Sequence, residues 1–299
     1  MPDNRLDGSG VADLLTCLKG DVKSPFNVFA DNAAAHNSIY RGKFLGTSVT
    51  AAQWQAIRDG KFTDMYIGDY WTIGGQDWVI CHFNYYINKG SMYKYHIVIM
   101  PRAAMTIPSG TVLYGTSPQQ TLTLLTGESS TAFNWSNNSG STAGGYKYSR
   151  MRQVIMKAAN KIVIDIFGPS HVEPISVLYP NPSSSTDSGV ASGWTWFTGE
   201  QNTSTAKSIC DLCSETQVCG QQAWGLGSSY GNVVYEIGTD NIQFSIFALN
   251  SEFANIGNTW WLRSVRDSSH VAYYFSTGFI GNDNPYSPAA VRPRFVLVG

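Results

Sequence analysis

The sequence predicts an α+β fold built from short strands, two or three helices and long ordered loops. Segments with apolar residues at helical spacing are interspersed with strand-like segments, and stretches rich in Gly, Ser, Thr, Asn and Pro separate them. The chain has 299 residues, 43% of them hydrophobic, so it can bury a large core. Only 14% are charged, well below the usual share of about a quarter. Together with the many aromatic residues, this composition favours a protein that works on an external surface over a cytosolic metabolic enzyme.

The first 38 residues are expected to form a separate N-terminal element. Residues 11–19 fit a short amphipathic helix with Leu14, Leu15 and Leu18 on one face, and a polar, Ala-rich connector follows at 31–38. A helix this short is marginal alone, so we expect it to pack either on a neighbouring segment or on copies of itself. If it packs on copies of itself it is an oligomerisation element, and we predict a homo-oligomer, a trimer. Residues 39–299 then form a single α+β domain, because no repeat, charge run or Gly/Ser linker divides them.

Three further segments are expected to be helical. Thr50 and Gln53 form a capping-box pattern that starts a helix ended by Gly60. Residues 149–167 give the clearest helical periodicity, and Gly168 followed by proline stops it. Residues 208–218 are the third, ended by Gly220. The expected buried face of the longest helix comprises Met151, Val154, Ile155, Ala158, Ile162 and Ile166.

Strands are expected on both sides of these helices. Residues 69–73 and 77–83 flank Gly74-Gly75, a two-residue hairpin signal. Residues 95–100 read as a buried strand ended by Pro101. Further strands are predicted at 243–247, 260–263, 272–275 and 294–298. The Ser-, Thr- and Pro-rich stretches 127–146 and 180–193 are predicted to be loops.

The C-terminal end of the chain lacks five residue types. From Leu262 to Gly299 there is no Lys, Gln, Glu, Met or Trp. These types make up 43 of the 299 residues, so about five would be expected in a stretch of this length. One interpretation is that a loop-rich region simply disfavours them. The other is genetic: randomising the adenines of Asn codons yields fifteen residue types and excludes these five, as diversity-generating retroelements do in their target proteins.

Several motifs resemble tail-associated structural proteins encoded by prophages of Gram-positive gut bacteria. They occur in the same order from about residue 40 to the end. The matching segments are Tyr40–Gly46, Ile67–Ile73, Gly144–Arg152, Phe167–Gly168, Trp261–Ser264 and Val291–Pro293. This resemblance implies a virion tail protein, made in the bacterial cytoplasm without a signal peptide, whose partners are other tail proteins and a host cell-surface protein or glycan.

The C-terminal portion resembles the C-type-lectin-like (formylglycine-generating-enzyme-like) domains of retroelement-diversified proteins. That resemblance implies a variable region at 264–290, presented on short strands as an exposed, non-enzymatic binding face. The Glu-Pro-Asn and Gln-Pro-Asp sugar-binding tripeptides are absent. Asn282, Asp283 and Asn284 could offer oxygens to Ca²⁺, but we expect a turn there and no metal or other cofactor.

The candidate ligand-contacting residues form a paratope-like set of Tyr, Phe, Ser and Asn, which combines rigid aromatic area with adaptable hydrogen bonding. They are Val265, Arg266, Asp267, Ser268, His270, Tyr273, Phe275, Ser276, Phe279, Asn282, Asp283, Asn284, Tyr286 and Ser287. A second set should be buried beneath them, comprising Trp261, Leu262, Val271, Ile280, Val291, Phe295 and Leu297. Arg263 and Arg292 lie in apolar segments at the two ends and should bond to loop carbonyls or to an Asp.

Catalytic and metal-binding patterns are weak. The five histidines are scattered, and no Gly-x-Ser-x-Gly, Walker or dinucleotide pattern occurs. Cys210, Cys213 and Cys219 lack a fourth zinc ligand and are expected to be core residues of a helix. A glycan-degrading tail enzyme remains an alternative, with Asp69 and Asp77 as a carboxylate pair and aromatics such as Trp194 to stack on sugars. A purely structural baseplate subunit is the other alternative.

Charge and hydropathy exclude other partner classes. The net charge is −1, which argues against electrostatic capture of nucleic acid. No apolar stretch approaches 18 residues, so no membrane insertion is expected, and the polar N-terminus does not resemble a secretory signal.

Overall fold

The computed structural model describes most of the chain from residue 32 onward. The described residues are 32–89, 92–105, 133, 146, 149–182, 191–198, 209–221, 242–267, 270–274, 280–285 and 289–299. For residues 176–182, 191–198, 265–267, 270–274 and 282 the description covers the backbone alone. The predicted helix at 11–19, and most of the predicted loop at 127–146, lie outside the described residues.

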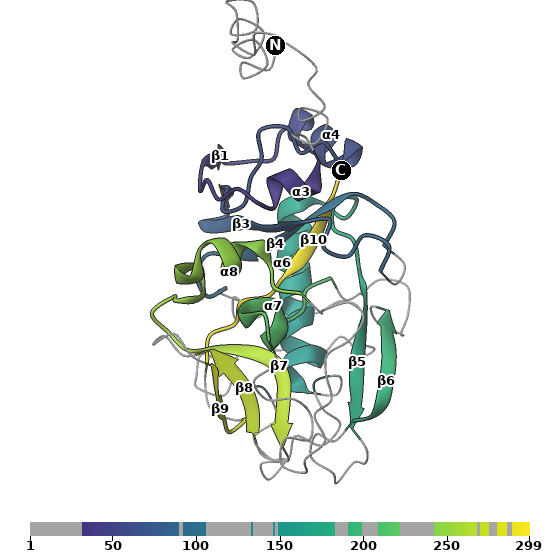
Figure 1. Cartoon of the computed structure of the whole chain (residues 1–299), viewed down its shortest axis with the longest axis vertical. Helices are drawn as coiled ribbons and strands as arrows, with labels where there is room; N and C mark the ends of the chain where they lie inside the picture. Colours follow the sequence, from purple (N-terminus) through teal and green to yellow (C-terminus); the bar gives the residue numbers. More distant parts are fainter. Residues whose placement is uncertain are drawn as a thin grey trace, which may run out of the picture.

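The described part of the chain has an α+β architecture, with a five-stranded sheet at its centre (Figure 1). The strand order is β1-β2-β3-β4-β10; β1 and β2 are parallel and the other neighbours antiparallel. The strands are β1 (Phe44–Gly46), β2 (Tyr70–Ile73), β3 (Gln76–Phe83), β4 (His96–Pro101) and β10 (Phe295–Val298). Every residue of β4 and β10 is buried, because helices cover the sheet on both sides.

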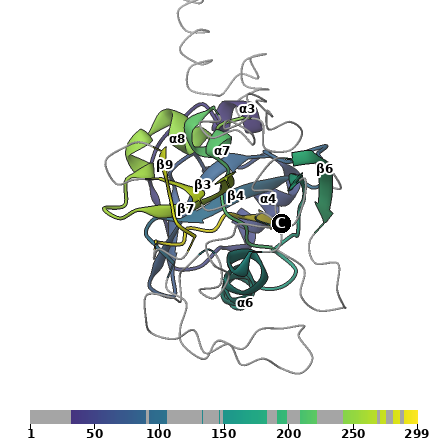
Figure 2. The same cartoon turned by 90° about the horizontal axis from the view of Figure 1, so that it is seen from below.

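Helices lie on opposite faces of β3 and β4 (Figure 2). On one face is α6 (Met156–Phe167), whose Phe167 ring packs edge-on against Trp78 at 5.7 Å between centroids. On the other are α7 (Glu215–Cys219) and α8 (Ser245–Leu249), followed by the 3₁₀ turn η5 (Ser251–Ala254). The buried apolar cluster joins residues from α4 (Ala51–Asp59) to β10, so early and late parts of the chain share one core.

Two local signals are confirmed. Helix α4 begins with a full capping box between Thr50 and Gln53 and ends at Gly60 in the left-handed conformation. The β2–β3 hairpin turns at Gly74 and Gly75, both with positive φ, and pairs Ile73 with Gln76. Positive φ at two successive positions is the geometry that glycine adopts without strain.

The longest helix is confirmed, but its predicted buried face is shifted. It begins as a π-helical turn, η2 (Met151–Ile155), and continues as α6. Up to Ala158 the predicted face is buried, whereas Val163 and Phe167 are buried in place of Ile162 and Ile166, which are only partly covered. A π turn adds one residue to the helix, and that moves the inward-facing positions one residue along the chain.

Four local predictions were wrong. Residues 243–247 do not form a strand, since helix α8 begins at Ser245. In the segment predicted as helix 208–218, residues 209–214 are not helical, and the helix α7 begins only at Glu215. The stretch 180–193 is not simply a loop, because its ends belong to the paired strands β5 (Ser176–Pro182) and β6 (Ala191–Thr198). The connector contains a short helix, α3 (Ala33–His36), capped by Asn32.

Within the described residues, no helix has the length and apolar character required to cross a membrane.

Candidate binding face

The C-terminal segment forms a small antiparallel sheet of its own, made of β7 (Trp260–Asp267), β8 (His270–Tyr274) and β9 (Ile280–Asp283). It lies at the end of the molecule away from α4 (Figure 1). The β8–β9 register is regular from Val271↔Asp283 to Tyr274↔Ile280. The β7–β8 register is irregular. Between the pairs Trp261↔Tyr273 and Val265↔Val271, the chain advances four positions in β7 but only two in β8.

This small sheet brings the backbone of some predicted ligand-contacting positions close together. Those whose backbone the small sheet brings together are Val265, Arg266, Asp267, His270, Tyr273, Asn282 and Asp283. Those outside the described residues are Ser268, Phe275, Ser276, Phe279, Tyr286 and Ser287. Asp283 is half-buried at the end of β9 and accepts a hydrogen bond from the Asn284 backbone N–H at 2.6 Å, while Asn284 is exposed and leads into a turn.

The layer predicted beneath these positions is largely buried. Trp261 and Leu262 at the start of β7 are fully covered, and so are Phe295 and Leu297 in β10; Val291 is 3% exposed. Ile280 was expected to be mostly buried; it is partly buried and packs against the core from the outer strand of the small sheet. Val271 is described by its backbone alone.

The base of β7 is fixed to two other segments. The Trp260 indole N–H donates to the Ala254 carbonyl at 2.9 Å, and its ring stacks on Phe247 of α8 at 6.4 Å. The Trp261 backbone N–H donates to the Ala290 carbonyl at 3.0 Å, and the Ala290 N–H to the Thr259 carbonyl at 2.8 Å. Backbone hydrogen bonds therefore join the two ends of the segment that carries β8 and β9 at the point where it meets the core.

Arg292 is the main clamp at this base, as predicted. Its side chain is fully buried, and it donates to the Pro101 carbonyl through Nε (3.3 Å) and Nη2 (3.2 Å) and to the Phe253 carbonyl through Nη1 (3.0 Å). The guanidinium also lies over the rings of Phe253 (4.5 Å) and Trp260 (4.8 Å). Burial lowers its pKa to about 10, which still leaves it charged at neutral pH. Arg263 is buried too, and its backbone N–H donates to the Cys213 carbonyl at 3.0 Å.

A buried polar cluster centred on Asp211 was missed by sequence reasoning. Its carboxylate accepts from the Tyr146 hydroxyl at 2.5 Å and lies 3.6 Å from Arg294 Nη2 and 4.0 Å from Arg152 Nε. Burial, with the Asp211 charge, raises the pKa of Tyr146. The backbones of Asp211 and Arg294 also exchange two hydrogen bonds, of 3.0 and 2.7 Å. The one sequence signal was Arg294 itself, a second arginine in the apolar run 291–298.

Two buried histidines hold turns in place. Nε2 of His96 accepts from the Tyr86 backbone N–H at 3.0 Å, so the ring proton lies on Nδ1, 2.9 Å from the Lys94 carbonyl. Nδ1 of His82 accepts from the Ser245 backbone N–H at 3.0 Å, at the first turn of α8. Burial lowers the pKa of His96 to about 4, and burial together with the neighbouring charges lowers that of His82 to about 3.

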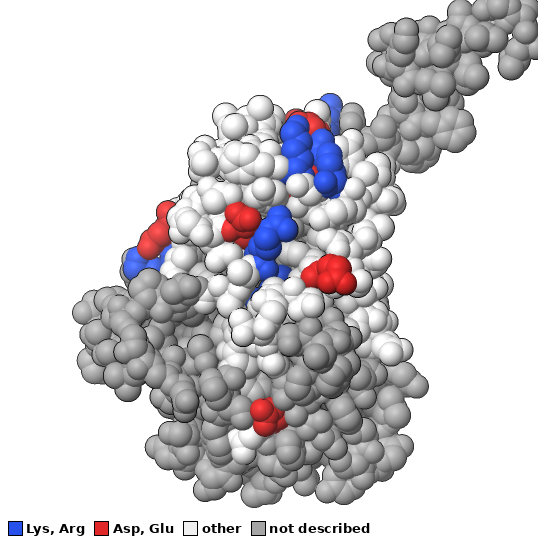
Figure 3. Space-filling model, turned by 90° about the vertical axis from the view of Figure 1, so that its left-hand side faces the viewer, with Lys and Arg blue, Asp and Glu red and all other residues white. Residues whose placement is uncertain are grey.

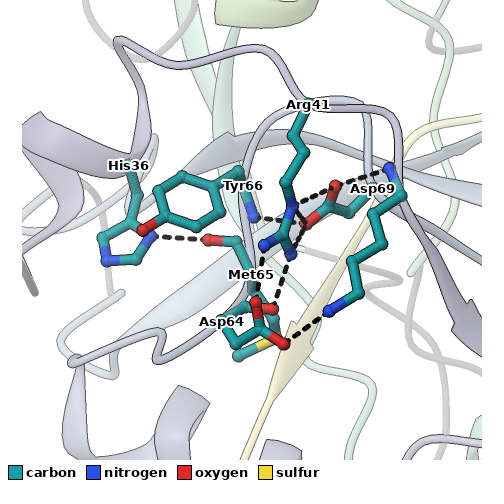
Figure 4. Close-up of polar contacts among 7 residues, drawn as sticks. His36, Arg41, Asp64, Met65, Tyr66 and Asp69 are labelled. Carbon is teal, nitrogen blue, oxygen red and sulfur yellow. Dashed lines mark hydrogen bonds and ion pairs between the residues drawn. The ribbon is translucent and has the colours of Figure 1, made fainter.

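Each carboxylate of the suggested catalytic pair accepts a hydrogen bond from an arginine. Asp69 is fully buried and accepts from Arg41 Nη2 (2.6 Å) and from the backbone N–H groups of Lys43 (2.8 Å) and Tyr66 (2.7 Å), as Figure 4 shows. Asp77 accepts from the Thr72 hydroxyl (2.6 Å) and from Arg102 Nε (3.1 Å). Both carboxylates are thus engaged by an arginine and by other donors of the fold, and Asp69 is closed off from solvent, so we assign the pair a structural role.

Arg41 also contacts the exposed Asp64 and the ring of Tyr66, on which His36 stacks. Its Nη1 pairs with Asp64 at 2.5 Å, and Lys43 Nζ pairs with the same carboxylate at 2.7 Å, which lowers the pKa of Asp64. Its guanidinium lies 4.6 Å from the Tyr66 ring centroid, and His36 stacks on that ring at 4.7 Å (Figure 4). These contacts fix the loop before β2, and we assign them a structural role.

The three clustered cysteines do not form a metal site with other described residues. Cys210 and Cys213 are buried in the stretch before α7, so the prediction that they lie on a helix was wrong. Cys219 is the last residue of α7. Burial raises the pKa of Cys210, and it raises that of Cys219 to about 11. Across the described ranges, no three His, Cys, Asp or Glu side chains converge as metal ligands would.

Comparisons with known proteins found no match for this chain: no family model, no curated protein and no solved structure is similar to it.

Proposed function

We propose that this chain is a non-enzymatic ligand-binding protein of a phage or prophage tail, and that it binds a host surface protein or glycan through the β7–β8–β9 sheet and its loops. In this proposal the C-terminal part has a C-type-lectin-like fold whose residues 264–290 are diversified. The protein acts as a homotrimer in the virion tail beside other tail proteins, because several linked weak sites raise avidity without new contacts.

The observation that carries the proposal is where the compositional gap falls. The five residue types are missing from Leu262 onward, and residues 262–283 include nearly all of the small sheet. The gap thus covers all of the small sheet after its first two residues and continues through β10 of the central sheet, and Trp260 and Trp261 immediately before it are fully buried. Much of this stretch belongs to the strands β7, β8, β9 and β10, so a preference of loops against these types does not account for it.

The arrangement also supplies what a variable site needs physically. Backbone hydrogen bonds hold β8 against β7 and β9, and they do not depend on which side chains the strands carry. The base is fixed separately by Trp260, Arg292 and the Ala290 bonds. Exposed substitutions on such a scaffold usually cost less than about 0.5 kcal/mol each.

A paired set of variants tests this division. The triple variant Asn282→Ser/Asp283→Ser/Asn284→Ser alters the end of β9, and Trp261→Ala alters the base of the same sheet. We expect the triple variant to lower the free energy of unfolding by less than about 1.5 kcal/mol, and Trp261→Ala by roughly 3–5 kcal/mol. Equal losses would mean that the variable segment is part of the core, and the structural-subunit interpretation would replace this one.

The genetic part of the proposal has an independent test. Sequencing the DNA around the gene should reveal a reverse transcriptase and a near-copy of its 3′ end that differs at adenines of Asn codons. If neither element lies near the gene, the diversification part of the proposal is wrong. Binding through an invariant face would then need separate binding measurements.

A further inference from the structure

A surface hollow of about 410 Å³ lies between the end of β4 and the α8–η5 segment. Its size is within the range of small-molecule sites, which span about 300–1,000 Å³. The hollow is lined by Arg102, Ala103, Asn250, Glu252, Phe253, Asn255 and Ile256. None of these residues belongs to the β7–β8–β9 face, so the hollow is separate from the proposed binding site.

The hollow has a fixed apolar floor. Phe253 is 6% exposed, and its ring contacts the Arg292 guanidinium at 4.5 Å and the tilted Phe247 ring at 5.6 Å. Ile256 beside it is partly buried and packs on the core. An apolar floor with a few polar groups around it is the usual composition of a ligand site.

The polar groups around this floor retain unused hydrogen-bonding capacity. Arg102 is positioned by its Nε bond to Asp77 (3.1 Å) and lies over the Tyr70 ring at 4.5 Å, and its two Nη groups have no bond to any described residue. The Asn250 amide and the Glu252 carboxylate are equally unengaged with the described part of the chain. Asn255 uses only its Oδ1, which accepts from the Gly257 N–H at 3.1 Å, so its NH₂ group is available.

We propose that this hollow binds a neutral sugar residue. A guanidinium and a carboxylate line the same hollow, so a ligand with one net charge would be attracted by Arg102 and repelled by Glu252, or the reverse. Sugar hydroxyls both donate and accept, so neighbouring hydroxyls can donate to Glu252 and accept from Arg102 and the two Asn amides. The C–H face of the ring then covers the floor formed by Phe253 and Ile256.

The surrounding surface fits an uncharged ligand as well. On the face shown in Figure 3, described basic and acidic side chains lie close to one another and do not gather into a patch of one sign. The described charges of this face therefore form no patch of one sign that would steer a charged ligand toward the hollow.

NMR titration of the full-length, ¹⁵N-labelled chain tests the proposal directly. The probes are the methyl β-glycosides of glucose, galactose and N-acetylglucosamine, each added to tens of millimolar, because a single sugar is expected to bind with a millimolar Kd. We expect saturable shifts of the Asn250 and Asn255 side-chain amide signals and of the Arg102 Nε–H signal with at least one glycoside. No saturable shift with any of the three would overturn the proposal.

Matched variants locate the site. Ala103→Phe fills the hollow and should abolish the shifts, whereas Ala248→Phe, at an exposed position of α8 that does not line it, should leave them unchanged. Glu252→Gln keeps the shape and removes a charged acceptor, so it should weaken binding about tenfold. Unchanged binding in both Ala103→Phe and Glu252→Gln would refute the site. Stronger shifts of the same signals by acetate or glycine would show a charged or zwitterionic ligand and refute the sugar.

Discussion

Acidification from pH 7 to pH 5 should destabilise this protein through His82 and His96. Both rings are buried and neutral, and each accepts a backbone N–H through its unprotonated nitrogen. A proton on that nitrogen would remove the acceptor and leave a charge in the core. The unfolded chain has no such restriction, so its histidines take up protons near a pKa of about 6.5.

The size of the effect follows from the two pKa values. Both folded-state values are lowered, to about 4 for His96 and about 3 for His82, so between pH 6.5 and pH 4 the unfolded state binds more protons than the folded state. The free energy of unfolding therefore falls as the pH falls through this window, by at most about 1.4 kcal/mol per pH unit for each histidine. From pH 7 to pH 5 each contributes about 2 kcal/mol, and the two together about 4 kcal/mol.

Urea denaturation followed by tryptophan fluorescence at the two pH values measures this loss. His96→Gln and His82→Asn each keep an acceptor near the lost nitrogen but cannot titrate, so each should reduce the pH-dependent loss by about half. The double variant should show almost none of it. If the parent chain loses less than about 1 kcal/mol, or if the double variant loses as much as the parent, the two imidazoles are not the groups that respond to acid.

Three further outcomes are expected in the same unfolding assay. Phe295→Ala should cost roughly 3–5 kcal/mol, because its fully buried ring packs on Trp78; a loss below 1 kcal/mol would contradict this packing. Arg292→Met should cost roughly 2–4 kcal/mol, since two buried carbonyls lose their donors, and an unchanged stability would show that the clamp is dispensable. Asp211→Asn should cost about 3–5 kcal/mol by removing the buried carboxylate that Arg152 and Arg294 face; a neutral result would show that this charge does not stabilise the fold.

Local signals predicted the elements whose ends depend on nearby residues. The Thr50–Gln53 capping box and the Gly74-Gly75 hairpin are satisfied within a few residues, so their patterns were sufficient. The start of α7 had the same kind of signal, because Ser214 and Gln217 form a capping box, and its omission explains why the predicted helix began too early.

Tertiary interactions decided what the sequence could not predict. The N-terminus of α8 has no side-chain cap of its own and uses His82, which lies 163 positions earlier in the chain. Its alternating apolar residues therefore gave no sign of a helix. The polar cluster around Asp211 is equally non-local, because its members come from three distant segments: Tyr146 with Arg152, Asp211 itself, and Arg294.

The candidate site was predictable where the pattern was apolar. Trp261, Leu262 and Val291 form a buried layer, as their position beside aromatic and aliphatic neighbours indicated. Which polar positions meet above that layer depends on the β7–β8 register, and its irregularity between Trp261 and Val265 has no sequence signature.

The central sheet can form completely only when translation has continued through β10. This strand pairs with β4 in the central sheet, and Phe295 and Ile99 are partners across nearly 200 positions. It follows β7, β8 and β9 in the chain, so a polypeptide that stops early or shifts frame within them never supplies it. Contacts between such distant segments form late and slowly in folding. A product that ends before β10 would leave β4 as an open and mostly apolar edge strand, and such products are degraded or aggregate in the cell. Any sequence change within β7 to β9 would therefore be compatible with the fold only if translation continues in frame through Val298.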